Sequence, residues 1–258
     1  MVLLDETGRN RIAPFYRGTT KTMVWSCLQG MMGEAAADNA YAPRCARIVL
    51  GDFCYPAGDA DAAGAKELLA ALPPHEMLLV PPDAEWASRI ERVWDGRCRR
   101  LERYAIQKNP AAFDREWLRR LAVGIPEGYR IQPIGEDIYE TVMKENWSRD
   151  FCSNFRSCED FCQRGLGFVA LKGGELAGGA SSYSVYRGGL EIEVDTKPEH
   201  RRKGIAAACA ARLILACLER GWYPNWDAAN TASVRLAEKL GYRLEAAYPA
   251  YAVSPEPA

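Results

Sequence analysis

Histidine is scarce in this chain of 258 residues, which holds just His75 and His200. Its nine cysteines are scattered without the paired spacing of a zinc site or a disulfide framework. The closest pair, Cys158 and Cys162, lies one helical turn apart and fits two packing residues better than two metal ligands. We therefore expect no metal site and reduced thiols, as is typical of a cytoplasmic protein.

The sequence also lacks a charge excess and a long apolar run. Its 33 Lys and Arg face 34 Asp and Glu, so there is no general basic field and we expect no nucleic-acid partner. Asp5 and Glu6 come before any signal-like apolar core, and Arg212 interrupts the longest apolar stretch, residues 205–218. Neither export nor membrane insertion is expected.

The first half of the chain alternates helical and strand-like segments. Residues 22–38, 65–72, 81–94 and 114–122 favour helices, and residues 46–55, 77–80 and 99–107 favour strands. The turn-forming stretch from Gly124 to Gly128 then separates two periodic regions. The pattern predicts two domains, residues 1–126 and 127–258, the first an α/β unit without a chemical motif.

The second half is more regular. Residues 129–134, 190–196 and 223–227 favour strands, residues 167–172 and 177–186 a hairpin around Gly173 and Gly174, and residues 242–253 one or two closing strands. Residues 136–147, 158–164, 203–220 and 231–240 favour helices, the third with a continuous apolar face. The whole chain is thus predicted to have an α/β fold of the α+β kind.

One segment, residues 191–206, carries chemistry. It is predicted to be a strand, a turn and the start of a helix, whose unpaired N–H groups and positive dipole end can hold a phosphate. Gly204 lets the main chain approach a ligand and Ala206 leaves space, while Arg201, Arg202 and Lys203 add local positive charge. A pyrophosphate suits this arrangement best; a solvated charged turn is the alternative.

The sequence Arg201-x-x-Gly204-x-Ala206 resembles the acyl-CoA signature of the GNAT acyltransferase superfamily. Residues 226–242 are similar to the later strand and helix of that family, so the resemblance spans residues 129–253. The two-domain layout resembles the zwittermicin-resistance type of GNAT acetyltransferase. The resemblance implies a C-terminal GNAT-like mixed, mostly antiparallel central sheet flanked by helices, with acetyl-CoA as co-substrate and no metal.

The resemblance also implies where acetyl-CoA binds. The end of the strand would hydrogen-bond the pantetheine and polarise the thioester carbonyl, and the loop would hold the pyrophosphate. Asn230 and Ser233 would face the CoA arm, although both residue types also suit a helix cap. The implied binding residues are Val194, Asp195, Thr196, Arg201, Arg202, Lys203, Gly204, Ile205, Ala206, Asn230 and Ser233.

A protonated amine must lose a proton before it attacks, so the reaction needs a base. Glu191, Glu193 and Asp195 are spaced two apart and are predicted to share one side of the strand. Glu193 is our first candidate for the base and Glu191 the second, while the exposed face of an edge strand is the alternative. Many family members carry a Tyr, the general acid, where this chain has Ala237, so the usual acid is absent.

Three functions remain open at this point. The first is N-acetylation of a small-molecule amine, the second is acylation of a protein or peptide amine, and the third is acyl-CoA binding without turnover. The predicted first domain could shape the acceptor pocket, be a degenerate copy of the catalytic fold, or serve to form a homodimer.

Overall fold

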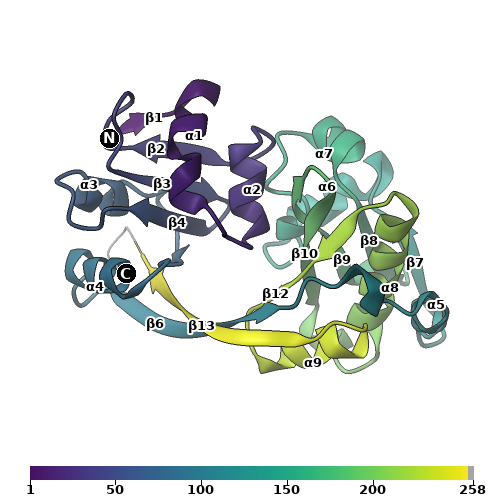
Figure 1. Cartoon of the computed structure of the whole chain (residues 1–258). Coiled ribbons are helices and arrows are strands. Elements are labelled where there is room, and N and C mark those ends of the chain that lie inside the picture. Colours follow the sequence, from purple (N-terminus) through teal and green to yellow (C-terminus); the bar gives the residue numbers. More distant parts are fainter. Residues whose placement is uncertain (255–258) are drawn as a thin grey trace. The chain divides into compact units, whose positions relative to one another are not determined.

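The computed structural model describes residues 1–254, and the chain divides into two compact units (Figure 1). The first comprises Met1–Arg103 and the chain from Ala247 onward, and the second comprises Tyr104–Ala246. Two strands, β6 (Cys98–Ile106) and β13 (Leu244–Val253), begin in one unit and end in the other. These two compact units do not meet at residue 126, where the sequence predicts the domain boundary. That boundary stays a prediction.

The first unit is built on a mixed sheet in the order β1-β2-β3-β4-β5-β13-β6. Strands β4 and β5 are parallel, whereas β1 to β4 and the pair β5–β13 run antiparallel. The remaining elements of the unit are β1 (Val2–Leu3), α1 (Glu6–Ile12), a 3-10 turn (Ala13–Tyr16), α2 (Thr22–Leu28), β2 (Glu34–Ala37), β3 (Cys45–Leu50), β4 (Phe53–Gly58), α3 (Ala65–Ala70), β5 (Met77–Leu79) and α4 (Ala84–Val93).

Two expectations for this unit are wrong in detail. The helix predicted over residues 22–38 ends at Leu28, because Gly30 and Gly33 take positive φ angles of 73° and 84° that break it before β2 begins. The strand predicted over residues 46–55 is a hairpin of β3 and β4, with Gly51 (φ 57°) in its turn. In both places glycine supplies the reversal of the chain.

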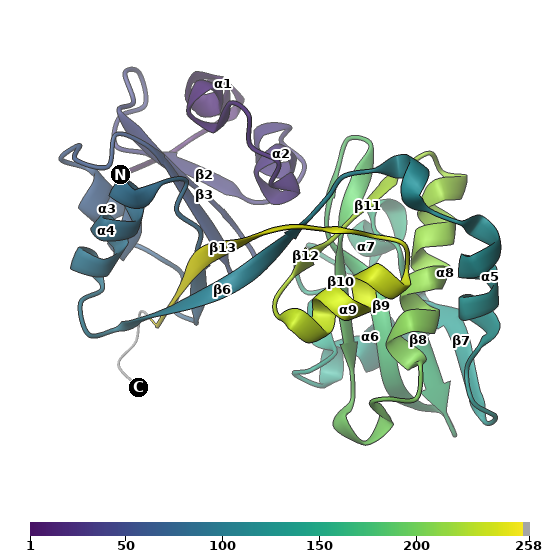
Figure 2. The same cartoon turned by 60° about the horizontal axis from the view of Figure 1, so that its bottom comes forward.

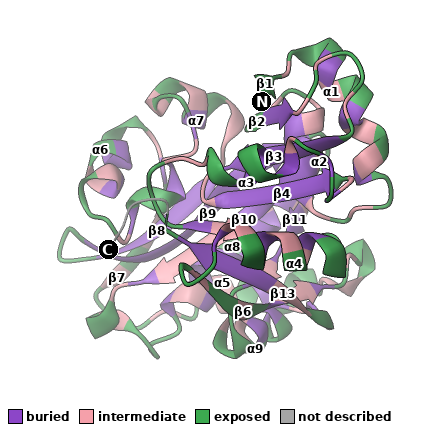
Figure 3. Ribbon diagram, turned by 90° about the vertical axis from the view of Figure 1, so that its left-hand side faces the viewer, coloured by how far each residue is buried: buried purple, intermediate pink, exposed green. Residues whose placement is uncertain are grey.

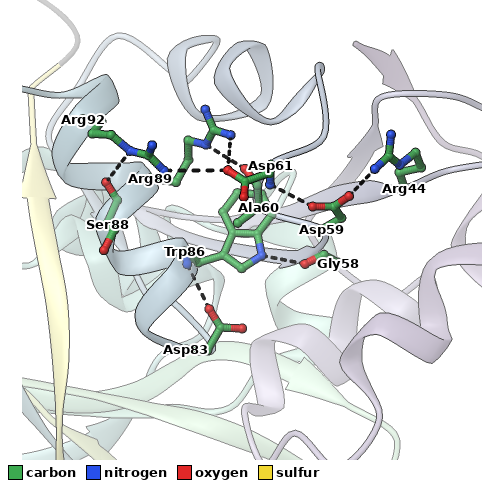
Figure 4. A network of polar contacts seen from close by, with 10 residues as sticks. All are labelled: Arg44, Gly58, Asp59, Ala60, Asp61, Asp83, Trp86, Ser88, Arg89 and Arg92. Atoms are coloured by element: carbon green, nitrogen blue, oxygen red, sulfur yellow. Dashed lines mark hydrogen bonds and ion pairs between the residues drawn. The ribbon is translucent and has the colours of Figure 1, made fainter.

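The core of the first unit lies between the sheet and helices α3 and α4. Figure 3 shows β3 and β4 buried along most of their length, while the helices expose their outer faces. Trp86 is fully buried, and its indole N–H donates to the Gly58 carbonyl at 2.9 Å (Figure 4). Arg89 joins the same loop, donating to the Ala60 carbonyl at 2.7 Å and to Asp61, whose side chain is 84% exposed. These contacts of Arg89 link α4 to the loop after β4.

The second unit contains a five-stranded sheet in the order β11-β10-β9-β8-β7. Neighbouring strands run antiparallel except β10 and β11, which are parallel. The mostly antiparallel sheet with flanking helices confirms the predicted fold class. The elements are 3-10 turns at Pro110–Ala112, Arg149–Phe151 and Pro198–His200, α5 (Arg115–Val123), β7 (Tyr129–Pro133), α6 (Glu136–Lys144), α7 (Cys158–Arg164), β8 (Gly167–Lys172), β9 (Glu175–Tyr186), β10 (Gly189–Thr196), α8 (Ile205–Glu219), β11 (Tyr223–Asn225), β12 (Asp227–Ala228) and α9 (Thr231–Lys239).

Strands β10 and β11 part before β10 ends. Their paired positions run from Gly189–Tyr223 to Glu191–Asn225, after which β10 continues to Thr196 without β11. The register between β9 and β10 also shifts, because Glu191 pairs with Ser184 and Ile192 with Ser182, so β9 holds one extra residue there. The second half of β10 therefore has one backbone edge that β11 does not cover.

Two adjacent glycines on β9 let elements approach both faces of the sheet. A Cβ at Gly178 would lie 3.0 Å from the Ile205 side chain on α8, and one at Gly179 would lie 2.8 Å from the Phe151 ring. Adjacent strand residues face opposite sides, so α8 and the turn at Arg149–Phe151 pack on opposite faces. Figure 2 shows α5 beside α8 on the first of these faces. Among residues 1–254, no helix is long and apolar enough to span a membrane.

Gly179→Leu is expected to lower the free energy of unfolding by about 1–3 kcal/mol, because the added side chain meets Phe151 and Val169 in a packed core. Glu175→Ala, at the exposed start of the same strand, is the control and should change it by less than about 0.5 kcal/mol. Urea denaturation of both variants measures the difference; equal midpoints would show that the contact is not tight.

Candidate functional site

The loop between β10 and α8 reverses the chain with two left-handed residues. Arg202 has φ 59° and is the one non-glycine residue in the described range with positive φ, and Gly204 has φ 83° at the N-cap of α8. An arginine rarely adopts this conformation, which costs about 1–3 kcal/mol and is often found at functional sites. Such left-handed turns point successive backbone N–H groups into a concave, anion-attracting surface.

The backbone N–H groups that end this loop and begin α8 lack acceptors within the described residues, unlike those of His200 and Arg201 earlier in the loop. From Arg202 through Ala207 no acceptor is recorded among residues 1–254, and the first helical hydrogen bond is donated by Ala208 to the Gly204 carbonyl at 3.0 Å. No side chain caps the helix either. A run of unpaired N–H groups at the positive end of a 15-residue helix can donate hydrogen bonds to phosphate oxygens.

Basic side chains of the loop hold its shape. Arg201 donates from Nε to the Thr196 carbonyl at 3.0 Å, and Lys203 donates from Nζ to the Glu199 carbonyl at 2.8 Å. His200 lies 2.7 Å from the hydroxyl of Tyr129 on β7, from Nδ1 to Oη. The sequence pattern does not reveal this contact, because the sheet sets the place of Tyr129 beside the loop.

Thr196 ends β10 directly before this loop. Its side chain is 8% exposed, and Oγ1 is buried with no hydrogen-bond partner among the described residues. A Cβ at Gly178 would meet both this oxygen and the Ile205 side chain at 3.0 Å, which places the hydroxyl beside the first residue of α8. An unsatisfied buried hydroxyl is costly unless something else bonds to it, and a bound ligand would supply that partner.

The predicted CoA-binding residues therefore fit an acyl-CoA at several points. Val194 and Asp195 lie on the part of β10 that β11 leaves, and a pantetheine could hydrogen-bond that edge. The Asp195 carboxylate accepts the Thr196 N–H at 2.6 Å and lies 3.9 Å from Arg201, so it also stabilises the start of the loop. Ile205 is buried and packs the helix on the sheet, while Ala206 is partly exposed.

Asn230 and Ser233 have structural partners at the start of α9. The Asn230 side chain accepts the Ser233 N–H at 3.0 Å as an N-cap, and the Ser233 hydroxyl accepts the Trp226 indole N–H at 3.0 Å. Their predicted CoA contacts stay predictions. Ala237 is fully buried in α9, so its position presents a methyl group in the core and no hydroxyl.

The candidate bases differ in their surroundings. Glu191 is 4% exposed and accepts a hydrogen bond from Nδ2 of Asn225, the last paired residue of β11, at 2.6 Å. Lys108 donates in turn to Oδ1 of Asn225. Glu193 and Asp195 are partly exposed on the uncovered part of β10. Sequence reasoning missed Lys108 and Asn225; a buried Asn in a short strand was the available signal.

The negative charge of Glu191 acts on three tyrosines. Burial, and then the negative charge of Glu191, raise the pKa of Tyr186. Burial first and Glu191 to a smaller extent also raise the pKa of Tyr223 and of Tyr242, although the Asn109 N–H acts in the opposite direction on Tyr223. The phenols thus remain protonated near neutral pH. They donate to backbone carbonyls, Tyr186 to Tyr223 at 3.3 Å and Tyr242 to Pro224 at 2.7 Å.

Comparison with known proteins gives the family. The family model described as GNAT acetyltransferase matches residues 13–251 of this chain, which includes both compact units. The chain belongs to the GNAT acetyltransferase family. This membership confirms the resemblance at the level of the family and supports the class of acyltransferase enzymes.

Individual relatives agree with this assignment. A crystal structure of a GCN5-related N-acetyltransferase-like protein from Streptococcus suis 89/1591 is 40% identical, covers 95% of this chain and 97% of its own, and has a TM-score of 0.89. The uncharacterized N-acetyltransferase YdfB of Bacillus subtilis (strain 168) is 26% identical over 170 residues, 64% of this chain. The match spans 62% of that relative, less than two thirds of its length. A GNAT-family acetyltransferase from Colwellia psychrerythraea, 10% identical, covers 98% of both chains with a TM-score of 0.55 and shares the fold.

The described residues contain no group of three or more His, Cys, Asp or Glu side chains placed to hold a metal ion. All nine cysteines are free thiols. Burial raises the pKa of Cys209 and of Cys217 on α8 to about 12, so both remain neutral packing residues.

Thr196→Val is expected to raise the free energy of unfolding of the ligand-free protein by about 1 kcal/mol, because it replaces an unpaired buried hydroxyl by a methyl group of the same shape. Thr196→Ser, which keeps the hydroxyl, is the control and should not gain stability. Chemical denaturation decides between them. A loss of stability in the valine variant would mean that the hydroxyl already has a partner within the folded chain.

Proposed function

We propose that the protein transfers the acetyl group of acetyl-CoA to a primary amine. The observation that carries this proposal is the run of unpaired N–H groups at residues 202–207, which lies next to the uncovered part of β10. A pyrophosphate would be held by the loop and by the helix dipole, with Arg202 adding an exposed positive charge. Acetyl-CoA supplies the activated acyl group as a thioester.

The chain's own residues then provide orientation and proton transfer. Backbone groups of Val194, Asp195 and Thr196 would hold the pantetheine along the edge that β11 leaves. An N–H group there would donate to the acyl oxygen as negative charge develops on it. A carboxylate would take a proton from the ammonium group, and the neutral amine would then attack the acyl carbon as the thiolate of coenzyme A leaves.

The geometry supports Glu191 best as this carboxylate, ahead of Glu193. Glu191 lies at the last paired position of β10 and β11, and the Asn225 amide fixes the direction of one of its oxygens. A base is effective when it is held in one orientation near the reacting atoms. Glu193, the first candidate from the sequence, becomes the second; it lies on the part of β10 that β11 does not cover and is more accessible to an incoming amine.

We propose a small-molecule amine as the acceptor, as in the zwittermicin-resistance type that the two-domain layout resembles. Acylation of a protein or peptide amine is the second candidate, and acyl-CoA binding without turnover is the third, supported by the methyl group at Ala237 in place of a hydroxyl donor. A cytoplasmic location, which the nine free cysteines suggest, and formation of a homodimer are further parts of the proposal.

Gly204→Ala is expected to weaken the binding of coenzyme A at least about 10-fold, because the methyl group disfavours the left-handed backbone and narrows the approach to the N–H groups. Gly128→Ala is a matched control, since Gly128 has φ 82° and open space around it but lies outside the loop. Isothermal titration calorimetry measures both. Equal affinities would contradict the assignment of the loop, and no affinity in the unaltered protein would overturn the proposed function.

Glu191→Gln is expected to reduce kcat by about 10²- to 10⁴-fold while coenzyme A affinity is retained, because the amide cannot accept the proton. Release of free thiol from acetyl-CoA with a panel of amines measures the rate. Glu175→Gln, at an exposed position of β9, is the control. If Glu193→Gln causes the larger loss, Glu193 is the base and the order proposed above is reversed.

A further inference from the structure

Lys108, Asn225 and Glu191 form a continuous chain of hydrogen bonds within the second unit. Lys108 donates to Oδ1 of Asn225, and Nδ2 of Asn225 donates to Oε2 of Glu191 at 2.6 Å. Asn225 is 5% exposed and Glu191 is 4% exposed, while Lys108 is partly exposed. The chain of hydrogen bonds thus reaches from a partly exposed position to the place where β10 and β11 part.

The chemistry of the end groups sets the orientation of the amide between them. A lysine ammonium group has only donors, and an ionised carboxylate has only acceptors. The Asn225 amide satisfies both when its oxygen faces Lys108 and its nitrogen faces Glu191. Without Lys108, the amide could turn over and present its oxygen to the carboxylate, which would repel it. Lys108 therefore determines whether the nitrogen or the oxygen of the Asn225 amide faces the Glu191 carboxylate.

The backbone of Lys108 is held on both sides by one tyrosine. The Tyr223 hydroxyl accepts the Asn109 N–H at 3.2 Å and donates to the Gln107 carbonyl at 3.2 Å. Tyr223 lies on β11, two residues before Asn225. The Gln107 N–H also donates to the Arg243 carbonyl at 2.9 Å. The strand that carries Asn225 thus holds the segment that carries Lys108. These backbone hydrogen bonds fix Lys108 and Asn225 relative to each other.

We propose that Lys108 is a positioning residue, which fixes the Asn225 amide so that this amide orients Glu191 as the base for the incoming amine. The inference rests on the proposed function, because it deepens the role of Glu191 in acetyl transfer. The amine donates its proton to the Glu191 carboxylate and forms its bond to the acyl carbon, and the thiolate of coenzyme A leaves. Lys108 touches neither substrate.

The first test compares three variants at Lys108 with a distant control. Lys108→Met, which removes the donor but keeps the length, is expected to lower kcat by about 10- to 100-fold with an unchanged KM for acetyl-CoA. Lys108→Arg and Lys108→Gln keep a donor and should recover most of the rate. Lys239→Met, at an exposed lysine that ends α9, should match the unaltered protein. A normal rate for Lys108→Met would overturn the inference.

The pH profile separates positioning from a structural role. The groups near Glu191 include Tyr186 on β9, Tyr223 on β11 and Tyr242 after α9, with Glu193 on its own strand and Lys108 beyond the Asn225 amide. The phenols stay neutral, and Lys108 adds a positive charge at the other end of that amide. Its removal disfavours the ionised carboxylate, and the acidic limb of kcat/KM should move to higher pH by about half a unit to one unit. A uniform loss at every pH would indicate a structural role instead.

A double-mutant cycle makes the test independent of folding losses. In a Glu191→Gln background, Lys108→Met should cause little further loss of kcat, because the group that it positions can no longer accept a proton. Independent, multiplying losses would overturn the inference even if each variant is folded.

One measurement does not depend on turnover. The side-chain amide of Asn225 can be followed by NMR as the pH is lowered, and its shift should report the ionisation of Glu191. The midpoint should rise in Lys108→Met and return in Lys108→Arg; identical midpoints would overturn the inference. If the unaltered protein turns over no amine, the proposed function fails, while this titration still decides whether Lys108 acts on Glu191.

Discussion

The parting of β10 from β11 is the constraint on which the rest of the second unit depends. The parallel ladder ends at Glu191 and Asn225, and β10 continues beyond it without pairing with β11. The same strand then leads directly into the left-handed loop before α8. A short stretch of chain therefore carries a candidate base, the backbone edge proposed for the pantetheine and the helix N-terminus proposed for the pyrophosphate.

Polar groups near the end of β10 fall into those that maintain the loop before α8 and those that lie near Glu191. Arg201, Lys203 and Asp195 bind within the loop and maintain its shape, which leaves the backbone N–H groups for an anion. The surrounding tyrosines donate to carbonyl groups and remain neutral because burial and the Glu191 charge raise their pKa. The negative charge near the parting strands is thus kept on carboxylates, which suits an acceptor that arrives as an ammonium ion.

Local patterns predicted much of this structure. Helix α7 matches its predicted range, and the loop at residues 201–206 lies between a strand and a helix as expected. Local patterns failed where glycine reverses the chain, as at Gly30 and Gly33, because apolar spacing continues through the turn. The hydrogen bond between Lys108 and Asn225 joins residues 117 positions apart and comes from strand pairing, which no local spacing encodes. Which carboxylate acts as base depends on that tertiary pairing.

The passage of β13 into the first unit has a consequence for biosynthesis. In the sheet of that unit β13 lies between β5 and β6, yet its residues from Ala247 to Val253 are made after the whole of Tyr104–Ala246. During translation, the sheet of the first unit lacks an inner strand until the residues after Ala247 leave the ribosome. The second unit can fold earlier. The nascent chain thus exposes the edges of β5 and β6 for that time, which makes this stage the one most open to chaperone binding and to aggregation.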